Sequence, residues 1–366
     1  INVEDLLERD AVDPYVHLLS KDIYGTVICI TGAGGSIGSE LTRQIIKFNP
    51  KKIILLDNSE SNLYQINSEI ESSKNLQREI IPVLGDCCNL EFLKNLFKQE
   101  KVDIIFHAAA YKHVPLVEIN PLNSINNNVF STLNICIASK NLSIKKVLMI
   151  SSDKAVRPTN IMGASKRLSE IIVQAFANDA QKNSLKKKDQ KTCFSMVRFG
   201  NVLSSSGSAV PLFIKQISSG GPVTLTHPKI TRYFMTIKEA SQLVIQSSAM
   251  AQGGEVFLLD MGKPICIKDL VIKLIKLSGL QLKDNSNPYG DIEIKITGLR
   301  PGEKLFEELL IDAEAEKTDH PLIFRAKENF IIMDEIIPKL ENLKKNIDER
   351  NKDQVFKILN EIVKEW

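Results

Sequence analysis

Long apolar runs, an excess of one charge and paired cysteine motifs are all missing from this sequence. No apolar run reaches the ~18 residues that a membrane-spanning helix needs, and the first residues do not resemble a signal peptide. The net charge of the 366-residue chain is only +3, so no general attraction to nucleic acid is expected. The six cysteines include no C-x-x-C pair, which argues against a disulfide framework and favours a reducing, cytosolic environment. The chain begins with Ile1 rather than Met, and we expect it to be a processed or truncated piece.

The sequence does contain a regular alternation of short apolar runs and helical patterns. Hydrophobic residues make up 43% and charged residues 25% of the chain, the balance of a soluble globular protein. Between the apolar runs, segments such as SELTRQIIKF repeat apolar residues with the period of a helix. This alternation predicts an α/β fold of the Rossmann type, a doubly wound parallel sheet covered on both faces. The six runs expected to form strands are 26–31, 52–57, 79–86, 102–109, 145–151 and 193–198.

The spacing of these patterns suggests a division of the chain into four parts. Residues 1–24 form a polar, helix-like arm interrupted by Pro14, and residues 25–203 form the Rossmann domain. From 204 to 320 the spacing is irregular, as expected for a smaller substrate-binding lobe with some strands that return to the sheet. We expect a helical segment at 321–366. The basic stretch 181–191 is interpreted as a solvated loop, with a phosphate or membrane-surface patch as the alternative.

The most specific local motif is TGAGGSIG, residues 31–38, which lies between an apolar run and an amphipathic helical pattern. Glycines here let the backbone turn sharply and approach a pyrophosphate, whose charge faces the amino end of the following helix. A tight turn without a ligand is the alternative, but strand, motif and helix occur together here. We therefore predict a dinucleotide site whose contacts come from Gly32, Gly35, Ser36, Ile37 and Gly38.

Asp57, which closes the second apolar run, indicates which dinucleotide to expect. Its carboxylate can accept hydrogen bonds from both ribose hydroxyls and would repel a 2′-phosphate. The next residues, Asn58 and Ser59, include no arginine that could pair with such a phosphate. The sequence therefore favours NAD over NADP. Asp86, after the third run, is placed to accept from the adenine amino group, or else belongs to the amino end of the following helix.

Five motifs together resemble those of the extended short-chain dehydrogenases. They are TGAGGSIG, HAAAYKHVP (107–115), NNNVFST (126–132), SSDKAVRPTNIMGASKR (151–167) and VRFGNVLSSSGSAVPLF (197–213). More narrowly, residues 5–310 are similar to the bacterial nucleotide-sugar 4,6-dehydratases that act on UDP-N-acetylglucosamine, marked by methionine in place of the catalytic tyrosine. The resemblance is closest to the membrane-anchored dehydratases of bacillosamine synthesis in Campylobacter protein N-glycosylation. It implies retained configuration at C5, a missing N-terminal membrane region and a catalytic domain facing the cytosol from the inner membrane.

The resemblance implies a reaction that oxidises C4 of the sugar with NAD, removes water across C5–C6 and returns the hydride to C6. The 4-keto group acidifies the C5 proton, so elimination needs a base at C5 and an acid at the departing 6-hydroxyl. Asp153 and Lys154 follow the fifth apolar run, where this fold places the nicotinamide. We assign Asp153 as the acid and Lys154 as the base, with a solvated ion pair as the alternative. Lysine can be that base only if burial or a neighbouring cation such as Lys166 lowers its pKa.

Four more positions take their expected roles from the resemblance. Ser152 matches a hydroxyl residue that contacts the sugar O4, Lys166 matches the lysine on the nicotinamide ribose, and Ala108 lies in a cofactor-binding motif. Met162 stands in the tyrosine position of the catalytic set and, as a thioether, is interpreted as a packing residue in an active enzyme. The group that accepts the O4 proton stays open: Asp153, a water molecule, or Lys166 acting through Ser152.

The remaining expected contacts would hold the nucleotide and the sugar. A pyrophosphate favours planar, forked donors such as arginine. Asn201, Arg232 and Arg300 match family positions that hold the nucleotide, and Lys112 and His113 are expected to line the sugar pocket, although a lone histidine is as often structural. Histidines and cysteines show no metal-ligand spacing, so no metal is expected.

The sequence therefore predicts a UDP-N-acetylglucosamine 4,6-dehydratase, acting as a homo-oligomer and reaching a membrane only through the missing N-terminal region. A UDP-sugar C4 epimerase and a configuration-inverting dehydratase are alternatives, although both normally need the tyrosine. A non-catalytic protein that senses NAD or a sugar nucleotide is a third, because loss of the tyrosine is typical of such proteins. Against it stand Asp153, Lys154 and Lys166, for which a sensor has no chemical need.

Overall fold

The core of the protein is one large mixed sheet, seen in a computed structural model that describes residues 13–72, 79–184, 191–203, 205–308, 315–326 and 328–366. Within these residues nine strands follow the order β15-β16-β11-β6-β5-β4-β1-β2-β3. Their bounds are Val27–Thr31 (β1), Lys52–Asp57 (β2), Glu79–Leu84 (β3), Ile104–His107 (β4), Lys146–Ser152 (β5), Cys193–Phe199 (β6), Val256–Leu259 (β11), Glu316–Lys317 (β15) and Ile323–Ala326 (β16).

Strands β3, β2, β1, β4, β5, β6 and β11, in this order across the sheet, all run parallel. Strand β16 pairs antiparallel with β11, and β15 pairs antiparallel with β16. The order 3-2-1-4-5-6 is that of a doubly wound dinucleotide-binding sheet, so the predicted Rossmann-type fold is confirmed. In this arrangement the carboxyl ends of β1, β2, β4 and β5 lie along one edge of the sheet. Polar residues that follow those strands are thereby brought together.

Helices cover both faces of the sheet, which explains why its strands are apolar on both sides. Ile28 and Ile30 of β1 pack with α2, α3 and α10, while Cys29 faces the core shared with α4, α7 and α8. The helices are Val16–Ser20 (α1), Ser36–Ile45 (α2), Glu60–Glu71 (α3), Leu90–Glu100 (α4), Val114–Ile119 (α5), Pro121–Ile125 (α6), Ser131–Asn141 (α7), Ile161–Ser184 (α8), Ala209–Ser218 (α9), Ile237–Met250 (α10), Ile267–Leu277 (α11), Met333–Asp348 (α12) and Lys352–Ile362 (α13). Short 3₁₀ or π turns occupy Ile46–Phe48 (η2), Asn126–Phe130 (η3) and Asp153–Ala155 (η4).

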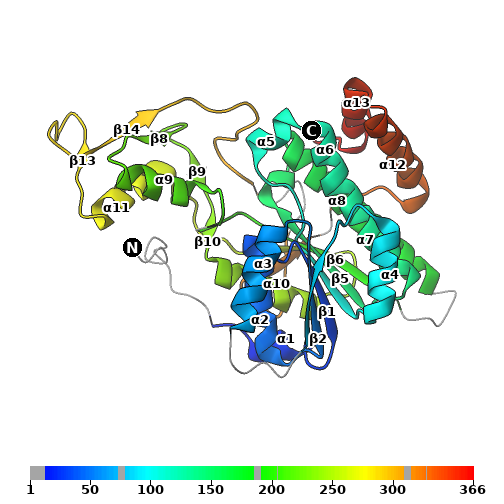
Figure 1. Ribbon diagram of the computed structural model, residues 1–366. Coiled ribbons are helices and arrows are strands. Elements are labelled where there is room, and N and C mark those ends of the chain that lie inside the picture. Colours follow the sequence, from blue (N-terminus) through cyan, green and yellow to red (C-terminus); the bar gives the residue numbers. More distant parts are fainter. Residues whose placement is uncertain (1–12, 73–78, 185–190, 204, 309–314, 327) are drawn as a thin grey trace.

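A smaller lobe with its own hydrophobic core lies at one end of the sheet (Figure 1). There α9 and α11 pack on a small sheet of β8, β13 and β14. The chain returns from the lobe to the main sheet at β11, and again at β16, which lies inside the segment that we expected to be helical. Helices α12 and α13 follow and pack beside α8. The lobe's short strands are Asn201–Val202 (β7), Val223–Leu225 (β8), Thr231–Arg232 (β9), Phe234–Met235 (β10), Ile265–Cys266 (β12), Leu282–Lys283 (β13) and Ile292–Ile296 (β14).

The described part of the amino-terminal arm packs on helix α10. The backbone N–H of Tyr15 donates to Gln246 Oε1 (2.8 Å), and Lys21 Nζ donates to the carbonyl of Ala249 (3.1 Å). Residues 1–12 of the arm and 185–190 of the basic stretch lie outside the described residues. No helix in the described ranges is both long and apolar enough to cross a membrane.

A buried ion network joins α8 to the sheet and to the carboxyl-terminal segment. Glu170 on α8 is fully buried; its Oε1 accepts from Ser151 Oγ (2.7 Å) and its Oε2 from Arg198 Nη2 (2.7 Å). Arg167 Nη1 donates to the same carboxylate (3.2 Å), and Arg198 Nη1 reaches Glu328 Oε1 (2.8 Å). Burial acts to raise the pKa of Glu170, but the two guanidinium groups outweigh it and lower that pKa. The carboxylate is therefore ionised at neutral pH.

We predict that Glu170→Gln lowers the free energy of unfolding by about 3–5 kcal/mol, because two buried guanidinium groups each lose a counter-ion. Arg198 then retains Glu328, and Arg167 retains Glu365. Urea unfolding would measure the change. Glu316→Gln is the matched control, since it breaks an exposed glutamate–arginine pair with Arg325 (3.0 Å) and should cost less than about 1 kcal/mol. Equal effects of the two substitutions would show that the network contributes nothing special.

Candidate active site

The turn between β1 and α2 has room only for glycine at its tightest points. Gly32 has φ +65°, and a Cβ there would lie 2.8 Å from the Cα of Ala109. A Cβ on Gly38 would collide with the carbonyl oxygen of Gly32. The turn thus brings backbone close to the amino end of α2, where Ser36 Oγ accepts from the N–H of Ser206 (3.1 Å). The predicted set of Gly32, Gly35, Ser36, Ile37 and Gly38 lies in this turn and the first turn of α2.

Asp57 holds this turn to the end of β2. Its Oδ2 accepts from the N–H of Gly34 and its Oδ1 from the N–H of Ser59, both at 2.9 Å. A cavity of about 280 Å³ opens beside it, and its lining includes Gly32, Gly35, Asp57, Asp86 and Ala108. Most of the predicted cofactor residues therefore meet around one cavity.

The position of Asp86 separates its two expected roles. Its side chain lines the cavity and its Oδ1 accepts from the N–H of Cys88 (2.8 Å). The helix that follows is capped instead by Asn89, whose Oδ1 accepts from the N–H of Phe92 (3.0 Å). Asp86 is thus not the residue that caps α4, and it remains one of the residues that line the cavity.

Asn128 is a positioning residue to which the sequence analysis gave no role. It lies in the π-helical turn η3, its Oδ1 accepts from the N–H of Tyr111 (2.7 Å), and its Nδ2 donates to Ser165 Oγ (3.0 Å). It therefore ties the loop after β4 to α8. The signal in the sequence was the run of three asparagines inside an apolar helical pattern. In the structure this run begins a π turn, an element that occurs often at functional sites.

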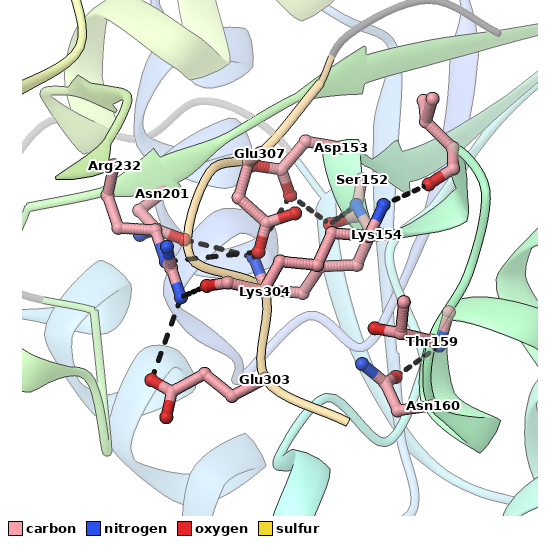
Figure 2. Close-up of polar contacts among 12 residues, drawn as sticks. Ser152, Asp153, Lys154, Thr159, Asn160, Asn201, Arg232, Glu303, Lys304 and Glu307 are labelled. Carbon is pink, nitrogen blue, oxygen red and sulfur yellow. Dashed lines mark hydrogen bonds and ion pairs between the residues drawn. The ribbon is translucent and has the colours of Figure 1, made fainter. Parts of the chain in front are cut away.

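Asp153, which is buried, and Lys154, whose side chain is 22% exposed, form an ion pair in the turn η4, directly after β5 (Figure 2). Asp153 is 0% exposed, and its Oδ1 accepts from Ser152 Oγ (2.9 Å) and from Lys154 Nζ (3.0 Å). Lys154 Nζ also donates to Oδ1 of Asn201 on β7 (3.2 Å). The second oxygen of Asp153, Oδ2, is buried and has no hydrogen-bond partner in the described residues. A buried polar atom without a partner is unusual in a folded protein, which marks Asp153 as a candidate functional residue.

The expected lowering of the Lys154 pKa is wrong for this structure. Burial does act to lower it, but the carboxylates of Asp153 and Glu307 outweigh burial and raise the pKa above its ordinary value. The cation that we expected beside it, Lys166, instead donates from Nζ to the carbonyl of Ile150 on β5 (2.8 Å). Lys154 is therefore protonated in its resting state.

Lys166 and Met162 lie one turn apart on α8 and differ in surroundings. Burial lowers the pKa of Lys166 to about 8. Met162 is buried in the core that α8 shares with the sheet. Met162 thus packs in the core, as expected, and its thioether carries no proton to exchange.

Residues 300–308, which we call the strap, lie across this pair (Figure 2). Arg232 on β9 donates from Nη2 to the carbonyl of Lys304 (2.8 Å), and from Nη1 to that of Leu305 (3.3 Å). Thr159 Oγ1 donates to the carbonyl of Gly302 (2.7 Å), and Lys304 Nζ donates to that of Val156 (2.6 Å). Arg232, predicted to hold a nucleotide, here holds the strap.

The strap brings in a third ionisable group, Glu307, which the sequence analysis missed. Its side chain is 3% exposed, and its Oε1 lies 3.8 Å from Lys154 Nζ and 3.8 Å from Arg232 Nε. Its Oε2 is buried and has no hydrogen-bond partner in the described residues. Burial raises the pKa of Glu307 above its ordinary value despite the opposing charges of Lys154 and Arg232.

Three other predicted substrate residues lie at the surface. Lys112 and His113, at the amino end of α5, are exposed, and the imidazole of His113 lies against Gly207. Arg300 begins the strap; its backbone N–H donates to Glu303 Oε2 (3.1 Å), and its exposed guanidinium has no ion-pair partner in the described ranges. These side chains could reach a ligand but are not part of the buried cluster.

Fold and site together define a Rossmann-type α/β protein with a buried acid–lysine pair at the carboxyl edge of its sheet. The chain belongs to the family described as "Polysaccharide biosynthesis protein", which it matches over residues 28–328.

Curated relatives of several kinds are similar to this chain. It is 46% identical over 361 residues to the capsular polysaccharide biosynthesis protein CapD of Staphylococcus aureus, covering 98% of this chain and 57% of CapD. It is 44% identical to the probable polysaccharide biosynthesis protein EpsC of Bacillus subtilis, covering 85% and 49%. The chain thus spans about half the length of these two relatives. A UDP-glucose 4-epimerase of Rickettsia massiliae is 30% identical, with 80% of each chain covered.

Solved structures share the fold. Pen from Bacillus thuringiensis superposes with a TM-score of 0.72 at 31% identity, covering 85% of this chain and 89% of that one. DesIV of Streptomyces venezuelae, a dTDP-glucose 4,6-dehydratase with NAD bound, gives a TM-score of 0.61 at 19% identity, covering 76% and 86%. The second likeness concerns the fold alone.

We predict that Gly302→Ala loosens the strap. Its φ is +76°, and a Cβ would lie 2.8 Å from the Cβ of Asn160. Gly298→Ala is the matched control, because its φ of +88° carries the same backbone cost of about 1–2 kcal/mol while open space surrounds the added methyl group. Hydrogen exchange of peptides from the strap should speed up in the Gly302 variant and much less in the control. Equal exchange in both would mean that contact with Asn160 does not hold the strap.

Proposed function

We propose that this chain is a UDP-N-acetylglucosamine 4,6-dehydratase that produces a UDP-4-keto-6-deoxy-N-acetylhexosamine. The observation that carries the proposal is the Asp153–Lys154 ion pair directly after strand β5 of a Rossmann sheet, with a buried carboxylate oxygen on Asp153 that has no hydrogen-bond partner in the described residues. An acid and a basic group held against each other are what an elimination needs. A sensor that binds without catalysis would gain nothing from burying them.

The residues around the cavity fit NAD. The glycine turn leaves no Cβ between the backbone and a pyrophosphate, and the carboxylate of Asp57 is fixed where ribose hydroxyls would lie. When bound there, NAD would accept a hydride from the sugar and return it. Lys166, held between α8 and β5, would bind the nicotinamide ribose, and its charge would favour hydride acceptance.

Within the sugar site, Asp153 would donate a proton to the departing 6-hydroxyl, and Lys154 would take the proton from C5. Ser152 Oγ already donates to Asp153, so it can hold the sugar O4 and pass a proton toward that carboxylate. This connection favours Asp153 as the group that receives the O4 proton, the proton that it then gives to the departing 6-hydroxyl. Asn201 and Arg300 would bind the UDP moiety, whereas Arg232, expected to do the same, is occupied in holding the strap.

A UDP-sugar C4 epimerase is the second candidate function, favoured by the similarity to the Rickettsia massiliae enzyme. An epimerase needs a group that takes and returns the O4 proton, normally the tyrosine of this fold. Met162 supplies none, and an epimerase has no use for a C5 base. The buried pair therefore favours elimination.

Narrower assignments rest on the sequence motifs. They are retained configuration at C5, a role in bacillosamine synthesis, a homo-oligomer, and a cytosolic catalytic domain within a membrane-anchored protein. One relative, 42% identical with 92% of this chain and 95% of that protein covered, is named an uncharacterized membrane protein of Methanocaldococcus jannaschii, which is compatible with the last of these.

We predict that NAD binds well ahead of NADP, because the Asp57 carboxylate would repel a 2′-phosphate. Calorimetry on protein stripped of cofactor would compare the two affinities. In Asp57→Asn the preference should shrink. Equal or tighter binding of NADP by the wild-type protein would overturn the role given to Asp57.

We predict that the wild-type chain converts UDP-N-acetylglucosamine in deuterated water to a 4-keto-6-deoxy product labelled at C5, as read by NMR. Asp153→Asn should lower turnover by ~10²-fold or more, the usual effect of losing a positioned proton donor. Met162→Leu is the control: it is equally aprotic and of similar volume, so most turnover should remain. A C4 epimer as the product would support the epimerase, and binding without turnover would support the sensor.

A further inference from the structure

The proposed reaction leaves one chemical difficulty at Lys154. A C5 base must be a neutral amine when it takes the proton, whereas the two carboxylates around Lys154 hold it in the ammonium form. The proton on Lys154 must therefore go to another group in the closed site before elimination can proceed.

We infer that Glu307 is the proton-exchange partner of Lys154, an inference that rests on the proposed function. In this step an N–H bond of the Lys154 ammonium breaks and an O–H bond forms on Glu307, so the pair changes from ammonium and carboxylate to amine and carboxylic acid. No proton enters or leaves the site. The neutral amine then takes the C5 proton.

Geometry favours Glu307 over Asp153 as the acceptor. Oδ1 of Asp153 already accepts hydrogen bonds from Ser152 and Lys154, and Asp153 is committed to the 6-hydroxyl. Glu307 Oε1 lies 3.8 Å from Lys154 Nζ, slightly beyond hydrogen-bond length, and such contacts tighten when substrate binds. Its Oε2 is buried and unpartnered in the described residues, so the carboxyl group has room for a proton.

The surroundings of Glu307 also favour a shared proton. The charged groups that face it are Lys154 and Asp153 from the turn after β5, Arg232 from β9, and Lys304 from the strap itself. Arg232 and Lys304 are both occupied with backbone carbonyls, of the strap and of Val156 respectively. Burial disfavours two separated charges, which brings the neutral amine–acid pair within reach.

The test compares turnover against pH in the wild-type protein and in Glu307→Gln. With Glu307 present, the resting and reactive pairs hold the same number of protons, so turnover should be nearly constant across neutral pH, below the pKa of Lys166 at about 8. In Glu307→Gln, Lys154 must release its proton to solvent, so turnover at neutral pH should be lower than in the wild type. Turnover of this variant should also increase with pH by about tenfold per pH unit, the slope of a single titrating group below its pKa. Glu307→Asp should restore part of the flat profile.

Glu308→Gln is the control, because Glu308 is exposed on the same strap and pairs with Arg157 (2.8 Å) away from the cluster. Its profile should match the wild type. A flat profile at reduced turnover in Glu307→Gln would make Glu307 merely structural, and unchanged turnover would remove it from the reaction; either result overturns the inference.

A measurement without substrate separates this inference from the proposed function. NMR of protein carrying ¹³C-labelled lysine, with the Lys154 signal identified from Lys154→Arg, follows the titration of Lys154. Its pKa should fall in Glu307→Gln and stay unchanged in Glu308→Gln; no difference between the two would overturn the coupling. If the wild-type protein makes no keto sugar while this shift is observed, it is the proposed function that fails.

Discussion

The fully buried carboxylate of Glu170 is the interaction on which the arrangement of the site depends. It joins Ser151 at the end of β5, Arg198 on β6 and Arg167 on α8, and Arg198 in turn reaches Glu328. Strand β5, which leads into the turn with the acid–lysine pair, is thus fixed to helix α8, which carries Lys166 and Met162. A buried charge tolerates displacement poorly, because each lost partner leaves an uncompensated ion.

Above this network, the site is assembled from three layers of the chain. The turn after β5 supplies the carboxyl group of Asp153 and the ammonium group of Lys154. Helix α8 supplies the buried Lys166, and the strap supplies a second carboxyl group, that of Glu307. Arg232 links the layers by binding the strap's carbonyls. The charge on Lys154 is therefore a property of the assembled site and would change if the strap moved.

Local sequence was sufficient for the sheet and for the contiguous parts of the site. Each of the six predicted runs coincides with a strand, and only β5 and β6 extend one residue beyond the predicted end, because continuously apolar segments of that length are typical of strands buried between two helical layers. The glycine turn and the Ser152–Lys154 turn were recognised because their residues are neighbours in the chain. The small strands β15 and β16 were missed, since strands of two to four residues have too little pattern to distinguish them from loops.

The sequence by itself determined the Rossmann sheet, the glycine turn and Asp57 beside the cavity, and the placement of Asp153 and Lys154 at the carboxyl edge of the sheet. These features follow from periodicity and from residues close in the chain. Only the tertiary structure decided that Glu307 reaches Lys154 and that Arg232 holds the strap. It also decided the pKa of Lys154: we had considered Lys166 as a neighbour that could lower this pKa, but two carboxylates raise it instead. The physical reason is that a pKa depends on burial and on charges in space, and those charges come from distant parts of the chain.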